Sequence, residues 1–191
     1  VSGGPDLAKI AANRVTLSRS DHSLLGMLVK RILNAGNIDQ IRDSLKISGS
    51  DITGSEGAGW SLEKESPEEL NRIITTLLGP HMGAGPKKGA TQRWIINHIK
   101  DCQGNAVPRF LVRLIESAAE KQLNTGNEYS TILSPLFVRE ALSDISREHI
   151  IASSEEWRWI PDFMDRIRRS PRIQTIPFEG KAFDSEMSKH W

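Results

Sequence analysis

Apolar residues recur at intervals of three and four along most of this chain, with polar residues between them, which is the pattern of amphipathic helices. The pattern predicts helices over residues 20–34, 38–47, 67–78, 91–100, 108–123, 135–151, 153–169 and 181–191. A short strand is expected over residues 172–178. We therefore expect an all-α protein, a bundle of six or more helices in two lobes with at most one or two short strands.

Several helix starts are marked by capping residues. Ser66 is followed by Pro67 and two glutamates, a combination that favours a helix N-terminus because serine caps, proline fits the first position and acids complement the dipole. Ser18 or Ser20 and Thr91 are predicted caps of two other helices. Pro161 predicts a kink or a new start within the helix expected from Ser153.

Composition shifts divide the chain. Glycines and serines crowd residues 48–59, which we expect to form a mobile loop before Trp60. The sequence Asn124-Thr125-Gly126-Asn127 predicts a linker over residues 124–133. The predicted organisation is a helical lobe over residues 1–123 and a second helical lobe over residues 134–191.

The charge of the whole chain points to no partner. Its 191 residues contain 25 Lys and Arg against 24 Asp and Glu, a net charge of +1. The single Cys102 excludes an internal disulfide, and the five scattered His residues show no metal-ligand spacing, so no metal is expected. No apolar run approaches the roughly 18 residues of a membrane span, and a reducing, cytoplasmic setting is the expectation. The start on Val1 without methionine suggests a piece of a longer protein.

A glycine- and lysine-rich stretch over residues 81–91 invites comparison with a phosphate-binding loop. Such a loop places its lysine after a glycine and directly before a serine or threonine, between a strand and a helix. Here Lys87 and Lys88 precede Gly89, and a predicted helix lies upstream. A flexible basic loop that can steer an anion fits better.

Arg109 is the leading candidate for a functional residue. It follows Pro108 at the start of a predicted helix, where a cation opposes the helix dipole and needs another reason to be present. A phosphate would supply that reason, since a guanidinium offers a planar fork of donors. The alternative is a surface ion pair with Asp101 or with a glutamate.

Other cations are candidate contacts for an anion or for nucleic acid. They are Lys87, Lys88, Arg93, Arg113, Arg166, Arg168, Arg169 and Arg172. The pair Trp157 and Trp159 fits the core and its rim better than a base-stacking platform. His98, without an acidic partner, is expected at the edge of the core.

The order of these features resembles the C-terminal helical region of bacterial P-loop ATPases of the AAA/STAND group, a family of unassigned biological role. The matching segments are residues 15–21 (VTLSRSD), 24–32 (LLGMLVKRI), 94–101 (WIINHIKD), 108–115 (PRFLVRLI) with Ala118 and Ala119, and 132–135 (ILSP) leading to 141–147 (ALSDISR). Together they cover roughly residues 11–156.

The resemblance implies a helical lid that follows a nucleotide-binding core, with Arg109 where such families often place a sensor arginine. ATP and Mg²⁺ are then cofactors of the parent protein and none belongs to this chain, which has no Walker A or Walker B motif and is not expected to be catalytic. The implied partners are the core in the same polypeptide and a protein effector or a further copy. A nucleic-acid-binding helical module is the alternative. A free-standing enzyme finds no support, because no acid, base and nucleophile converge.

Overall fold

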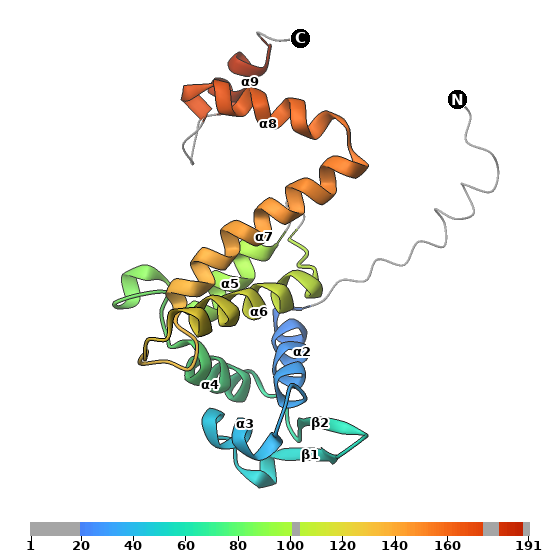
Figure 1. The fold of residues 1–191 in the computed structure, drawn as a ribbon, viewed down its shortest axis with the longest axis vertical. Helices are drawn as coiled ribbons and strands as arrows, with labels where there is room; N and C mark the ends of the chain where they lie inside the picture. The colour runs from blue at the N-terminus through green and yellow to red at the C-terminus, as the bar shows by residue number, and fades with distance from the viewer. Residues whose placement is uncertain (1–19, 101–103, 174–179, 189–191) are drawn as a thin grey trace, which may run out of the picture. The chain divides into compact units, whose positions relative to one another are not determined.

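The computed structural model describes residues 20–100, 104–173 and 180–188, which are mostly helical, as the periodicity predicted (Figure 1). The chain divides into two compact units, Val1–Ala141 and Leu142–Trp191. Helix α7 (Pro135–Glu156) contains the boundary between them. The predicted linker at 124–133 instead lies inside the first unit.

The segment between α6 (Pro108–Thr125) and α7 is hydrogen-bonded to α4 (Pro67–Leu78) and to α6, so it packs within the first unit and does not separate two units. The Leu133 amide donates to the Leu77 carbonyl at 2.8 Å. The Gln122 side chain accepts from the Ser134 amide at 2.7 Å and donates to the Ile132 carbonyl at 2.8 Å. These bonds satisfy the backbone of a segment whose composition resembles a linker.

Two helices form as their capping residues predicted. Ser20 precedes α2 (Asp21–Leu33), and its hydroxyl accepts from the Ser23 amide at 3.1 Å. Ser66 precedes α4 (Pro67–Leu78) and accepts from the Glu69 amide at 3.1 Å. The predicted apolar stripes form much of the core, which includes Leu24, Leu25, Leu28, Val29, Leu70, Ile73, Ile74, Leu77 and Leu78.

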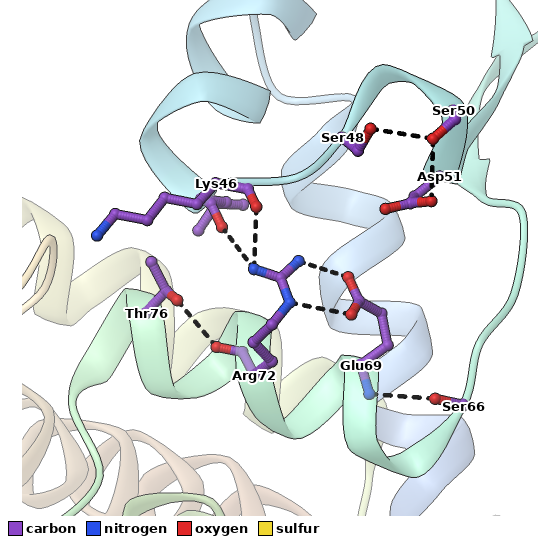
Figure 2. A network of polar contacts seen from close by, with 9 residues as sticks. Lys46, Ser48, Ser50, Asp51, Ser66, Glu69, Arg72 and Thr76 are labelled. Atoms are coloured by element: carbon purple, nitrogen blue, oxygen red, sulfur yellow. Dashed lines mark hydrogen bonds and ion pairs between the residues drawn. The ribbon is translucent and has the colours of Figure 1, made fainter.

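A polar network joins α4 to α3 (Ile38–Leu45), as Figure 2 shows. The Arg72 guanidinium donates to the Lys46 carbonyl at 2.9 Å, where Lys46 ends α3 in a left-handed conformation. It also makes a two-pronged contact with the Glu69 carboxylate. The hydrogen bonds from Arg72 lower the pKa of Glu69 below its ordinary value, against a smaller opposing effect of burial.

Residues 48–59 do not form the loop expected from their glycines and serines. A 3-10 turn at Gly49–Asp51 leads into an antiparallel hairpin of β1 (Ile52–Ser55) and β2 (Gly59–Leu62). A Cβ at Gly54 would lie 2.1 Å from the Gly59 carbonyl oxygen, so glycine is needed here for close strand contact. The Asn34 side chain holds β2 to the end of α2 through both backbone groups of Trp60, at 2.7 and 2.8 Å.

Helix α5 (Thr91–Ile99) begins differently from the prediction. Ala90 occupies the cap position, and Thr91 is the first helical residue, buried, with its amide donating to the Pro80 carbonyl at 3.1 Å. His98 is exposed and stacks on Trp94, with ring centroids 3.8 Å apart, so its expected place at the core edge was wrong. The buried face of α5 consists of Ile95 and Ile99, as expected, together with Ile96.

The second unit contains the end of α7, α8 (Trp159–Arg169), a 3-10 turn at Pro171–Ile173 and α9 (Gly180–Ser188). No helix starts at Ser153: α7 continues through this position to Glu156, and within it the Ser154 hydroxyl donates back to the Ile150 carbonyl at 2.7 Å. Pro161 lies in the first turn of α8, which is the new start that it predicted. Of the expected strand, residues 172 and 173 belong to the 3-10 turn, and 174–178 lie outside the described residues.

Candidate anion-binding groove

Arg109 lies at the second position of α6, directly after Pro108. Proline at the first helical position loses no hydrogen bond and fixes the start of the helix, which places Arg109 in its first turn. Val107 precedes the helix and gives it no side-chain cap. The side chain of Arg109 is exposed.

Helices α2 and α6 pack against each other in the first unit (Figure 1). A groove of about 1020 Å³ lies between α6 and the C-terminal half of α2. Its lining residues are Met27, Leu28, Lys30, Arg31, Ile32, Asn34, Ala35, Pro108, Arg109, Val112, Arg113, Ile115, Glu116 and Ala119. The floor is aliphatic and the rim is charged.

The charges of this groove are strongly one-sided. Four cations line it, namely Lys30, Arg31, Arg109 and Arg113, and Glu116 is the single acid among the described residues that line it. Glu116 lies 3.6 Å from Arg31 and 3.7 Å from Arg113, so one carboxylate is shared by two guanidinium groups. An anion that enters the groove would therefore meet more cationic than acidic side chains.

The predicted ion pair of Arg109 with a glutamate does not form among the described residues. Within the described residues, no hydrogen bond or ion pair of the Arg109 side chain is found, and the glutamate that lines the groove, Glu116, contacts Arg31 and Arg113 instead. Asp101, the other predicted partner, lies outside the described residues. The exposed guanidinium of Arg109 is therefore accessible to a ligand from solution.

No protein-family model, curated protein or solved structure matches this chain. The chemistry of the groove and of the other cationic segments therefore carries the functional argument.

Lys30 and Arg31 are the groove residues that sequence reasoning missed. Both fall just outside the apolar stripe of α2, where charged residues usually face solvent. A signal was present in their spacing, since Met27 lies three residues before Lys30 and four before Arg31, so both cations lie near Met27 on the helix surface. Only the packing of α2 on α6 shows that this face meets Arg109.

The other predicted cations do not join this groove, apart from Arg113. Lys87 and Lys88 belong to a 3-10 turn at Pro86–Lys88, and both are exposed, as is Arg93 in α5. The turn sits in a loop closed by an antiparallel bridge between His81 and Ala90, and α4 rather than a strand precedes it. This geometry agrees with the rejection of a phosphate-binding loop.

The arginines of α8 are partly neutralised within their own helix. Arg168 and Arg169 lie 3.3 and 3.6 Å from the two carboxylate oxygens of Asp165. Arg166 is half-buried, and the side chain of Arg172 lies outside the described part of the structure. This cluster therefore offers less free positive charge than its sequence suggested.

Among the described residues, no group of three or more His, Cys, Asp or Glu side chains could hold a metal ion. No helix in the described ranges is both long and apolar enough to cross a membrane.

Proposed function

We propose that this chain is the helical lid segment of a P-loop ATPase of the AAA/STAND type, and that Arg109 meets a phosphate of the bound nucleotide. Its role is to sense the nucleotide state and to pass it on to a partner, without catalysing a reaction itself. The setting implied by that family is the bacterial cytoplasm.

The observation that carries this proposal is the exposed guanidinium of Arg109 on the rim of a groove rich in cations. Lys30, Arg31 and Arg113 line the same groove, so the local potential favours a multiply charged anion. Arginine suits a phosphate because its donors form two parallel hydrogen bonds with phosphate oxygens. The resemblance of residues 108–115 to the sensor helix of such lids supports the same residue.

Of the two cofactors proposed for the parent protein, ATP suits the residues of this groove and Mg²⁺ does not. The cationic donors of the groove suit the phosphates of ATP. They repel a divalent cation, so Mg²⁺ would be held by the nucleotide-binding core of the parent protein. The part of this chain in the proposal is to bind and orient phosphate oxygens through its arginines.

The test is a titration of the chain with pyrophosphate, followed by NMR through the side-chain Nε–Hε signals of its arginines. We expect the Arg109 signal to shift on binding, and the Arg109→Ala variant to weaken binding about tenfold, which corresponds to 1.4 kcal/mol. Arg139→Ala removes an exposed arginine outside the groove and serves as the matched control. Equal binding by Arg109→Ala and the parent chain would remove the sensor assignment.

A second candidate function rests on the exposed cations before and in α5. Lys87, Lys88 and Arg93 lie within seven residues of one another, and no ion pair of these side chains is found in the described part of the chain. Such a cluster suits the backbone of a nucleic acid, which is recognised largely through its phosphates.

A further inference from the structure

We propose that the groove between α2 and α6 is a docking site for an acidic amphipathic helix of a partner protein. The inference rests on the lining of the groove and not on a contact between Arg109 and a nucleotide. It names the chemistry of a partner that the proposed function leaves open.

The floor of the groove fits the apolar face of a helix. Leu28 and Ile115 are buried at its base, and Met27, Ile32 and Val112 are half-buried above them. Ala35 and Ala119 add small side chains that allow close approach of another backbone. Burial of a partner's aliphatic side chains in this floor would remove their apolar surface from water, which favours binding.

The rim selects the charge of the occupant. Arg31 and Arg113 keep 65% and 45% of their side-chain surface exposed, and their shared acid, Glu116, keeps 42%. With Lys30 and Arg109 on the same rim, carboxylates on either side of an apolar stripe would find cationic partners. Such complementarity speeds encounter and excludes basic partners.

The length of the groove matches a short helix. Its wall on α6 extends from Pro108 to Ala119, which at 1.5 Å per residue is about 16 Å, or three turns. No aromatic side chain is among the described residues that line it, so a stacking surface for nucleic-acid bases is missing. An aliphatic floor with charged edges is instead the usual receptor for a helix that presents anchors at intervals of three and four.

The test uses fluorescence anisotropy with a stapled model helix of about 14 residues, long enough to span the groove. Leucines form one stripe of this peptide and glutamates flank them. We expect saturable one-to-one binding that weakens as salt is added. A peptide with lysine in place of every glutamate, and one with the same composition but scattered leucines, should bind at least roughly tenfold more weakly.

Two variants locate the site. Val112→Asp places a charge in the floor, and Arg31→Glu reverses a charge on the rim. Each should weaken peptide binding about tenfold or more, whereas Arg139→Glu, outside the groove, should leave it unchanged. Because Arg31 is mostly exposed, its variant stays informative even if Val112→Asp unfolds, which far-UV circular dichroism would detect.

Several outcomes would overturn the proposal. They are equal binding of the acidic and basic helices, unchanged binding by Arg31→Glu, and concentration-dependent self-association that this variant abolishes, which would make a second copy the occupant. Preferential binding of single-stranded RNA over the acidic helix, lost in the same variant, would assign the groove to nucleic acid. Pyrophosphate binding that survives Val112→Asp while peptide binding is lost separates this proposal from the sensor role of Arg109.

Discussion

At the scale of single residues, Arg72 is the clearest example of one side chain that serves two elements. Its guanidinium satisfies a carbonyl at the end of α3 and clamps the Glu69 carboxylate in the first turn of α4 (Figure 2). Carbonyls at helix ends have no partner within their helix, so this contact replaces water. Arg72 and Glu69 thus join the first turns of α4 to the C-terminal end of α3.

The Glu69→Gln variant tests this pair. The hydrogen bonds from Arg72 lower the pKa of Glu69 below its ordinary value of 4.5, so the carboxylate stabilises the fold above that pH. The contribution is lost as the pH falls through the lower pKa of the folded state. We expect the variant to lose about 1 kcal/mol of unfolding free energy at pH 7 and less at pH 3, measured by urea denaturation.

The matched control is Glu68→Gln, which removes an exposed carboxylate from the same helical turn outside the network. A stability difference between Glu69→Gln and the parent that is the same at both pH values would show that the Arg72 contact does not favour the charged carboxylate.

At the scale of elements, the hairpin of β1 and β2 shows that glycine can be required for an ordered structure as well as typical of a mobile loop. Composition suggested a mobile segment, but Gly54 has a φ of 129° and lies against the backbone of the opposite strand. The absent Cβ is what permits strand pairing there. Asn34 then attaches the hairpin to α2 through Trp60.

Gly54→Ala should therefore destabilise the protein by about 1–3 kcal/mol, because both the backbone conformation and the space are unsuited to a side chain. Gly36→Ala is the control, since Gly36 has no heavy atom within 4 Å of a built Cβ and is not among the glycines with positive φ. It should change stability by less than about 0.5 kcal/mol. Thermal unfolding of both variants measures the difference, and equal melting temperatures would argue against a paired hairpin.

At the scale of the whole molecule, a net charge of +1 hides an uneven distribution of cations. In the groove of the first unit they outnumber acids four to one, while in α8 of the second unit Asp165 offsets two arginines. The loop before α5 contributes two more exposed lysines. Overall charge is thus a poor guide to the partners of this protein.

This distribution allows the nucleic-acid alternative to be tested. If the loop before α5 contacts phosphates, the double variant Lys87→Glu and Lys88→Glu should weaken binding of a short DNA duplex and lower the salt dependence of log Kd by about two phosphate contacts. Arg168→Glu with Arg169→Glu is the comparison, because Asp165 already neutralises part of that cluster. Absence of binding to duplex and single strands at low salt would leave the groove as the functional surface.

The sequence by itself determined the helical class and much of the core. Ser20 and Ser66 cap the helices that they predicted, and the stripe of α4 from Leu70 to Leu78 is buried as its spacing required. These features depend on neighbours within one or two turns, so local periodicity and capping chemistry suffice to predict them.

Tertiary structure decided what depends on residues far apart in the chain. The hairpin needs Asn34 from α2, and the segment 124–133 is held by Leu77 and Gln122, contacts that no local pattern contains. The candidate site divides in the same way. Arg109 could be predicted as a site residue from its position at a helix start. Its neighbours Lys30 and Arg31 could not, because they join the site only when α2 packs on α6, which brings together residues about 80 positions apart.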